Sequence, residues 1–146
     1  LMDYNKFNFK IITKKDKKYI YDIIRKKYIL LTDEEKVRQL TIKFLIDKLE
    51  IPISHISSEK EFKIERGLKK RFDIIVFNKR GNIAILVECK SSKIKINTKV
   101  IDQILIYNKK LKAKYLMVTN GVKTIAFNCG LQNIEQINNL PKYLSL

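Results

Sequence analysis

Two apolar runs flank a polar turn in residues 71–90, whose sequence is RFDIIVFNKRGNIAILVECK. Together the runs are rich in Ile, Val and Phe, which favour β-strands. The break between them, Lys79-Arg80-Gly81, has the polar residues and the glycine of a turn. The segment therefore predicts an antiparallel β-hairpin, and the rest of the chain has to fold around these two strands.

Three charged side chains stand at one end of this hairpin. Because side chains alternate along a strand, Glu88 and Lys90 share one face of the second strand and Cys89 points to the other. The antiparallel arrangement brings Asp73, near the start of the first strand, beside the end of the second. Two neighbouring carboxylates repel each other unless a divalent cation lies between them, and Mg²⁺ is the usual ion where phosphate oxygens complete its ligands. The hairpin thus predicts a Mg²⁺ site at Asp73 and Glu88.

The length and composition fit one domain. With 146 residues and 45% apolar content, the chain can build one substantial core and leaves little room for a second. We expect a single domain over residues 1–146, in which residues 1–31 form an N-terminal extension of strands or a hairpin. The core is expected at about 32–129.

The charge balance favours a polyanionic partner. The chain has 31 Lys and Arg residues against 15 Asp and Glu residues, a formal net charge of +16. A soluble, lysine-rich surface without such a partner is the alternative interpretation. The charge is spread over many short clusters, at Lys14-Lys15, Lys17-Lys18, Lys26-Lys27, Lys69-Lys70, Lys93 and Lys95, and Lys109-Lys110.

Neither the cysteines nor the apolar runs indicate export or a membrane. Cys89 and Cys129 have no metal-ligand spacing, and nothing near the start of the sequence resembles a signal peptide. The longest uninterrupted apolar run, residues 83–87, is far too short to cross a bilayer. We expect a cytoplasmic protein in a reducing compartment, with no membrane span. The single histidine, His55, has no neighbouring ligand and is expected to be structural.

A capped helix is predicted from Thr32 to about Leu49. Thr32 and Glu35 have the spacing of a capping box, and acidic residues fill the first turn. On a helical wheel Glu34 falls with the apolar residues, whereas Glu35 falls at the boundary, where its capping role explains it. We therefore expect Glu34 to point toward the core. A first turn that reaches solvent is the open alternative.

A second helix is predicted over residues 98–111. Its flank carries a polar and basic stripe that could face a phosphate backbone. The alternative is an ordinary solvated helix face on which Tyr107 is half-buried. The members of this stripe are Lys99, Gln103, Tyr107 and Lys110.

The remaining segments give coarser predictions. Residues 6–31 suggest a short hairpin or two edge strands, and residues 61–65 a first strand of the core. Residues 115–119 and 122–129 predict a hairpin around Asn120-Gly121. Residues 131–146 are expected to form a short helix or coil.

An acid followed two places later by lysine is a common pattern in so basic a chain. It occurs four times, as Asp16/Lys18, Glu34/Lys36, Glu61/Lys63 and Glu88/Lys90. Only Glu88/Lys90 ends an apolar strand, follows a strand that carries an aspartate, and precedes a polar loop and a helix. This context places ionisable groups at the edge of a sheet, where a functional role is the better explanation.

Three motif elements follow one another along the chain: D at Asp73, ExK at Glu88-Cys89-Lys90, and QxxxY at Gln103-Ile104-Leu105-Ile106-Tyr107. In these elements and their order, the chain resembles the PD-(D/E)XK nuclease superfamily. More closely, it resembles the N-terminal nuclease domain of type I restriction enzyme R subunits. The segments that carry this likeness are YDIIRKKYILLTDEEKVRQ, RFDIIVFNKRGNIAILVECKSS and QILIYNKKLKAKYLMVTNG. The resemblance covers roughly residues 21–127. It departs from the superfamily pattern at Phe72, where proline would precede the aspartate.

The resemblance implies an α/β chain of the α+β type, with a restriction-endonuclease-like core and a mixed central β-sheet flanked by helices. It also implies that Asp73 and Glu88 bind Mg²⁺ or Mn²⁺, with the Cys89 backbone carbonyl as a further ligand. Lys90 would position the attacking water and balance charge in the transition state. Glu34 would orient a water or support a second ion, and Gln103 would contact the substrate or Lys90. The residues expected to bind nucleic acid are Arg71, Lys93, Lys99, Tyr107 and Lys110.

The function implied is metal-dependent cleavage of phosphodiester bonds, in DNA first and in RNA as an alternative. Endonuclease action is favoured over exonuclease action, in a restriction, defence or DNA-processing context. A homodimer or a larger restriction-type complex is expected, because each site cuts one strand. The alternatives are a binding or assembly module that acts only with a translocase or specificity partner, and a structural protein with an incidentally basic surface.

Overall fold

A computed structural model describes residues 8–146 of the chain, as nine strands, two α-helices and two short 3-10 turns. The N-terminal part contains β1 (Ile11–Lys14), β2 (Lys17–Asp22), β3 (Lys27–Leu30) and α1 (Asp33–Asp47). The remaining elements are η2 (Ile53–His55), β4 (Ile56–Lys63), β5 (Lys69–Phe77), β6 (Ile83–Cys89), α2 (Thr98–Leu111), β7 (Tyr115–Thr119), β8 (Thr124–Cys129), β9 (Ile134–Ile137) and η3 (Tyr143–Ser145).

The central sheet has six strands in the order β4-β5-β6-β7-β8-β9. Every neighbouring pair is antiparallel except β6 and β7, which run parallel because α2 carries the chain back between them. The strands at the middle of this sheet are buried on both faces, so β6 and β7 are nearly continuous apolar runs.

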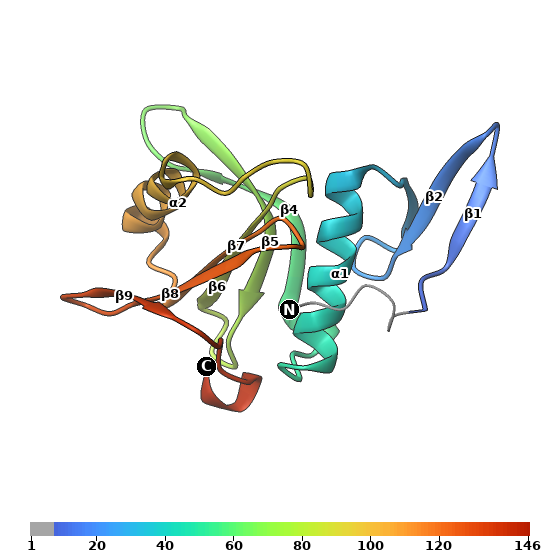
Figure 1. Cartoon of the computed structure of the whole chain (residues 1–146). Helices are drawn as coiled ribbons and strands as arrows, with labels where there is room; N and C mark the ends of the chain where they lie inside the picture. Colours follow the sequence, from blue (N-terminus) through green and yellow to red (C-terminus); the bar gives the residue numbers. More distant parts are fainter. Residues whose placement is uncertain (1–7) are drawn as a thin grey trace.

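The two helices cover opposite faces of the central sheet (Figure 1). One core cluster lies between the sheet and α1, and includes Leu45, Ile74 and Val87. The other lies on the α2 face, and includes Phe72, Leu86 and Ile104. The predicted mixed sheet flanked by helices is thus confirmed.

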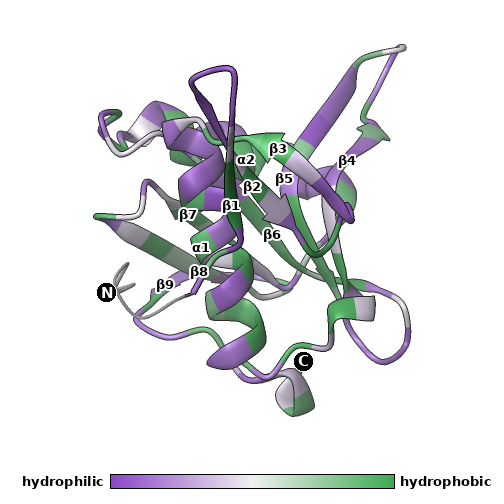
Figure 2. Ribbon diagram, turned by 90° about the vertical axis from the view of Figure 1, so that its right-hand side faces the viewer, coloured by the Kyte–Doolittle hydropathy of each residue, from purple (hydrophilic) through white to green (hydrophobic). Residues whose placement is uncertain are grey.

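A second, three-stranded sheet lies on the side of α1 away from the central sheet (Figure 1). Its middle strand, β2, buries Ile20, and the turn between β2 and β3 contacts α1 through Arg25. The hairpin of β1 and β2 projects beyond these contacts, and its tip is hydrophilic (Figure 2).

At the α1 N-terminus the Thr32 half of the predicted capping box is observed, whereas the Glu35 half is not, because the Thr32 N–H donates to the Leu30 carbonyl instead. The Thr32 side chain accepts a hydrogen bond from the Glu35 backbone N–H at 3.0 Å, which satisfies one of the free donors of the first turn. At the second helix Asn97 does the same for the Val100 N–H, at 3.2 Å. Both predicted helices therefore begin where their capping residues place them.

Several predicted elements differ from those observed. The hairpin in residues 71–90 is confirmed as β5 and β6, but the first core strand begins at Ile56 rather than near Glu61. Residues 131–146, expected as a short helix or coil, contain β9, which adds a strand to the edge of the sheet; only η3 is helical. Residues 1–7 of the predicted N-terminal extension lie outside the described residues.

Across residues 8–146, none of the helices has the length and apolar composition needed to cross a membrane. The longer of the two α-helices has 15 residues, and it carries charged side chains along its whole length.

We expect the Leu116→Ala substitution to lower the free energy of unfolding by about 2–5 kcal/mol, because Leu116 is fully buried in the α2-side cluster and its removal leaves a cavity. Leu131→Ala makes the same chemical change at a fully exposed side chain and is expected to stay within about 0.5 kcal/mol of the parent. Urea denaturation measures both. Equal losses in the two variants would contradict this description of the core.

Candidate functional site

The register of the hairpin brings Asp73 and Glu88 together. Ile74 pairs with Val87, so the next position along each strand places Asp73 opposite Glu88. The Cys89 backbone N–H donates a hydrogen bond to Asp73 Oδ2 at 2.7 Å. The register therefore places Asp73 opposite Glu88 at one end of the hairpin, as predicted.

The strand β5 changes face at Asp73. Phe72 belongs to the cluster on the α2 side, whereas Ile74 belongs to the cluster on the α1 side, so the regular alternation is interrupted between them. Opposite this point in β4, Glu59 has a positive φ of 57°, a conformation that non-glycine residues rarely adopt. The interruption lets Asp73 turn toward α1, while Glu88 faces α2.

Glu88 has an incompletely satisfied carboxylate. Its Oε1 accepts hydrogen bonds from Lys70 Nζ at 3.2 Å and from Lys90 Nζ at 3.5 Å. Its Oε2 is buried and has no hydrogen-bond partner among the described residues. Burial and the nearby charge of Asp73 raise the pKa of Glu88, and the two lysines offset only part of this rise.

Asp73 is in a different position, because both its oxygens have donors. Arg38 Nη2 donates to Asp73 Oδ1 at 2.7 Å, and Oδ2 takes the Cys89 N–H. Burial alone would lower the pKa of Arg38, but the charges of Asp73 and Glu35 outweigh this effect and raise it, so the guanidinium stays charged. Each carboxylate oxygen of Asp73 still has a second lone pair that can reach a cation.

The prediction that Glu34 points toward the core is wrong; the buried acid of α1 is Glu35. The Glu34 side chain is 48% exposed, and its contact is with Arg38 Nη2 at 3.7 Å. Glu35 accepts hydrogen bonds from Arg25, from Arg38 at 2.5 Å and from Gln39 at 2.9 Å.

The wheel failed because it assumed that polar residues mark a solvent face. The α1 helix is covered on two sides, by the central sheet and by the N-terminal sheet (Figure 1), so Arg38 and Gln39 are buried as well. They can be buried because they pair with Glu35, and this pairing offsets the cost of removing charge from water.

A small pocket lies between β5, β6 and α2 beside Glu88. Its wall brings Glu88 together with Gln103 and Tyr107, as the sequence predicted. The Phe72 and Tyr107 rings meet edge to face, with centroids 6.2 Å apart. The residues that line this pocket are Lys70, Phe72, Glu88, Val100, Gln103, Ile104 and Tyr107.

Lys70 was not predicted as a site residue. Its Nζ contacts Glu88 and lies 5.4 Å from the centre of the Tyr107 ring, so it stands between the carboxylate and the aromatic wall. Strict alternation along β5 would have put Lys70 on the face opposite to Ile75, away from this pocket. The change of face at Asp73 is what brings it here, and the sequence carries no clear signal of that change.

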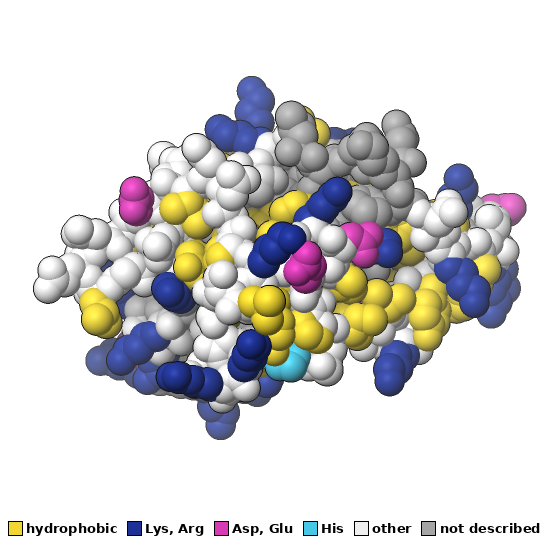
Figure 3. Space-filling model, turned by 90° about the horizontal axis from the view of Figure 1, so that it is seen from below, with side chains coloured by type: hydrophobic (Ala, Val, Ile, Leu, Met, Phe, Trp, Pro, Cys, Tyr) yellow, Lys and Arg dark blue, Asp and Glu magenta, His cyan; other side chains and the backbone are white. Residues whose placement is uncertain are grey.

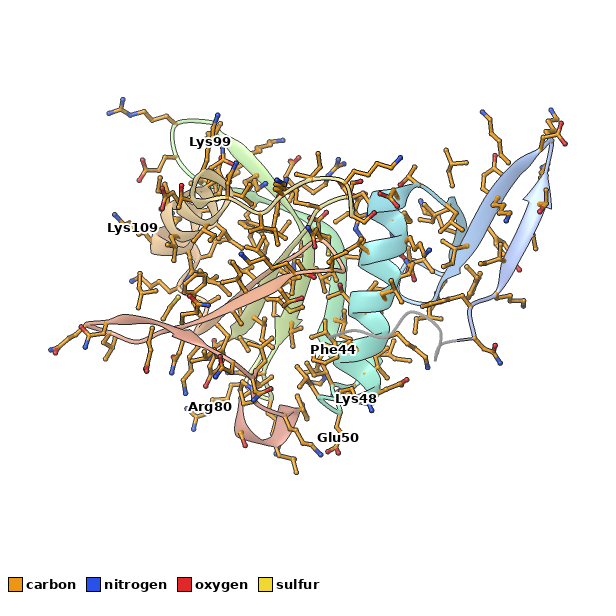
Figure 4. The ribbon with its side chains drawn as sticks, in the orientation of Figure 1. Phe44, Lys48, Glu50, Arg80, Lys99 and Lys109 are labelled. Carbon is orange, nitrogen blue, oxygen red and sulfur yellow. The ribbon has the colours of Figure 1, made fainter. Side chains whose placement is uncertain are left out.

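The other predicted nucleic-acid contacts lie outside the pocket. Lys93, Lys99 and Lys110 are exposed, and Lys99 projects from α2 at the upper edge of the molecule (Figure 4). Arg71 is also exposed, with its Nε 4.0 Å from Glu59 Oε1. The lining of the pocket includes none of these four side chains.

The chemistry of the donor set decides whether a metal ion fits here. Within residues 8–146 no three His, Cys, Asp or Glu side chains come together in a way that could hold a metal. Burial raises the pKa of the Cys89 thiol well above its ordinary value, so this thiol stays protonated and is a poor ligand. The donor that suits a hard cation is Glu88 Oε2, which has no partner among the described residues, with Asp73 opposite it in register on β5.

Comparison with family models matches residues 33–141 to the N terminus of type I restriction enzyme R proteins (HSDR_N). The chain belongs to this family. The matched range begins at the first residue of α1 and includes the pocket, Asp73 and the Glu88-Cys89-Lys90 strand end, so the predicted resemblance is confirmed. No curated protein matches the sequence.

Comparison with solved structures gives two matches, of which the first has the more similar fold. A fragment of a protein assigned as an HsdR subunit of a type I restriction enzyme from Vibrio vulnificus YJ016 aligns with a TM-score of 0.57 and 22% identity, over 77% of this chain and 24% of that one. A protein assigned as a nuclease of the DUF820 family from Anabaena variabilis ATCC 29413 aligns with a TM-score of 0.48 and 14% identity, over 88% of this chain and 80% of that one. The chain thus spans about a quarter of the HsdR fragment that it matches.

We expect Glu88→Gln to stabilise the protein by about 1 kcal/mol at neutral pH in EDTA, because it removes the charge of a buried carboxylate whose Oε2 has no hydrogen-bond partner among the described residues. The sign follows from the raised pKa. The folded state holds the Glu88 proton more tightly than the unfolded state, so the parent loses stability as pH rises from the ordinary value of 4.5 through the folded pKa. The advantage of the variant should grow across the same interval, as measured by thermal unfolding.

Glu135→Gln, on the exposed edge strand β9, is the control and should leave this pH dependence unchanged. Added Mg²⁺ should stabilise the parent and leave Glu88→Gln unaffected. A variant that is no more stable than the parent at any pH would show that Glu88 is fully satisfied without a metal.

The two neighbouring acids of α1 should differ sharply in stability. Glu35→Gln removes the charge that Arg25 and Arg38 share, and is expected to cost about 2 kcal/mol or more. Glu34→Gln changes an exposed side chain and should cost less than about 0.5 kcal/mol. Urea denaturation of the matched pair measures the difference, and the reverse order would restore Glu34 as the inward acid.

Proposed function

We propose that this chain is a metal-dependent nuclease that hydrolyses phosphodiester bonds in DNA, as an endonuclease of a restriction or defence system. The observation that carries the proposal is the buried Glu88 Oε2, which has no hydrogen-bond partner among the described residues and lies beside a second carboxylate. Such an acceptor costs free energy as long as it stays unpaired. A divalent cation would pair with it and would favour the charged form of Glu88.

Asp73 and Glu88 would hold the Mg²⁺ or Mn²⁺ ion, with the Cys89 backbone carbonyl as a further ligand. The ion would supply positive charge at the scissile phosphate and make a bound water more acidic. Lys90 lies beside the same carboxylate, where its ammonium positions the attacking water and balances the charge that develops on the phosphate.

The pocket wall supplies the contacts to the substrate. Gln103 and Tyr107 stand next to Glu88 on α2, where an amide and a phenol can hydrogen-bond to phosphate or sugar oxygens. Arg71, Lys93, Lys99 and Lys110 are exposed outside this pocket and would contact the DNA backbone. The acid of α1 that supports the site would be Glu35 rather than Glu34. Its role would be indirect, because it holds Arg38 against Asp73.

A second candidate is a nuclease-fold module that binds DNA but cleaves only with a translocase or specificity partner. The length of the relative favours it, because this chain corresponds to about a quarter of the HsdR fragment that it matches. A homodimer or a larger complex is also consistent with cleavage of both strands, since each site cuts one strand. Salt-dependent DNA binding without turnover, followed by cleavage when a partner is added, distinguishes this candidate.

Cleavage of plasmid and linear DNA in Mg²⁺ or Mn²⁺ tests the proposal. Asp73→Asn should reduce the rate at least about 100-fold, because it removes a ligand charge while keeping the side-chain shape. Lys90→Ala should have a similar effect, because it removes the ammonium next to the reacting phosphate. EDTA should abolish cleavage by the parent, and the rates are measured from gels of nicked and linear product.

Lys142→Ala is the matched control for Lys90→Ala, since Lys142 pairs with Glu50 at the lower end of the molecule (Figure 4). It should cleave at the rate of the parent. Cleavage that persists in EDTA would remove the metal from the mechanism, and full activity of Asp73→Asn would remove the assigned site.

A further inference from the structure

A lysine-rich β-ribbon projects from the domain and lies outside the part that matches the family. Residues 10–30, which we name the basic arm, form β1, β2 and β3, whereas the family match begins at residue 33. In Figure 1 the arm projects from the far side of α1, and its tip points to the same upper end as the N-terminus of that helix.

The exposed charge of the arm is almost entirely positive. One exposed acid, Asp16, accompanies its lysines; the other acid, Asp22, is buried and paired with Arg25. Seen from below, dark blue side chains gather at the right-hand end of the molecule, where the arm lies (Figure 3). The exposed lysines of the arm are Lys10, Lys14, Lys15, Lys17, Lys18, Lys26 and Lys27.

The tip of the arm concentrates like charges at a cost in stability. Lys14 is directly opposite Lys17 across the hairpin, and Lys18 is opposite Thr13. Like charges facing each other across an antiparallel pair destabilise it. The turn residues Lys15 and Asp16 both have positive φ, 48° and 60°, so this tight turn is made without the glycine that would adopt it most easily. A polyanion between the lysines would relieve the repulsion.

The β1–β2 hairpin of the arm is a ribbon whose tip is not covered by other parts of the described domain. All four residues of β1 are exposed, and residues 11–18 are exposed without interruption. The major groove of B-form DNA is wide enough for a two-stranded β-ribbon, whereas the deep, narrow major groove of duplex RNA is not. The shape therefore favours duplex DNA over duplex RNA.

We propose that the basic arm is a second DNA-binding element, which inserts the β1–β2 hairpin into the major groove and places Lys14, Lys15, Lys17 and Lys18 on the flanking phosphates. This inference rests on the proposed function, because it takes DNA as the substrate of the site. It adds an anchor apart from the pocket, connected to α1 at its base by the ion pair of Arg25 with Glu35.

The test is DNA binding in EDTA, where cleavage does not interfere, measured by fluorescence anisotropy of a labelled duplex across a salt titration. A variant with Gln at all four tip lysines should reduce the slope of log affinity against log salt by roughly 0.9 for each phosphate that the tip no longer neutralises. A variant with Arg at the same four positions keeps the charge and should bind like the parent.

The matched control removes four exposed lysines elsewhere, with the same change in net charge: Lys48, Lys79, Lys112 and Lys142. It should lower the slope less than the arm variant does. Equal effects of the two variants, or no effect of either, would overturn the proposal. Equal affinity of the parent for duplex RNA would overturn insertion into the groove.

The fate of the arm and the fate of the nuclease can be separated. Lys90→Ala should bind DNA with the parent's dependence on the arm while losing cleavage. If the protein binds DNA through the arm but never cleaves it, the arm proposal is supported and the nuclease proposal is rejected. If the four Gln substitutions change neither cleavage nor binding, the arm proposal is rejected and the nuclease proposal is retained.

Discussion

The guanidinium of Arg38 ties α1 to the central sheet. It donates to Glu35 on its own helix at 2.5 Å and to Asp73 on β5 at 2.7 Å, and it pairs with Glu59 on β4 at 3.1 Å. Each of these partners is mostly buried, so losing any one leaves a charge in a poorly solvated place. The N-terminal sheet joins the same network, because Arg25 from the β2–β3 turn shares Glu35.

This network makes the two site carboxylates unequal. Asp73 receives a charged donor and a backbone N–H, whereas Glu88 has two lysines on one oxygen and, among the described residues, no donor on the other. Glu88 Oε2 is therefore the unsatisfied acceptor of the site. Under the proposed function, the ion would therefore relieve Glu88 most, while Asp73 is already held in place for it by Arg38.

Sequence reasoning could predict what depends on local patterns. The hairpin of β5 and β6, the capping residue Thr32 and the pairing of Asp73 with Glu88 all follow from strand alternation, turn residues and capping chemistry, and all are observed. The family likeness carried the prediction further than these patterns do, since it linked Gln103 and Tyr107 to the same pocket.

What could not be predicted depends on contacts between distant segments. Glu35 rather than Glu34 is buried because the N-terminal sheet covers a side of α1 that a helical wheel assigns to solvent. Lys70 reaches the pocket because β5 changes face at Asp73, opposite the positive φ of Glu59. The spacing of Glu35, Arg38 and Gln39 on α1 was the available hint of a buried ion network.

The distribution of charge also shapes how a nucleic acid could approach. Lysines cover the outside of a chain with net charge +16, whereas Asp73 and Glu88 form a negative point inside it. A phosphate drawn to the surface would be repelled by these carboxylates at short range unless cations stand between them. Arg38 supplies such a charge on Asp73 Oδ1, and Lys70 and Lys90 supply two on Glu88 Oε1, but no described residue supplies one on Glu88 Oε2. The general attraction of the surface and the local repulsion of the site are thus opposed. Under the proposed function, a divalent ion at Glu88 would remove this repulsion, so that both would favour the same bound phosphate.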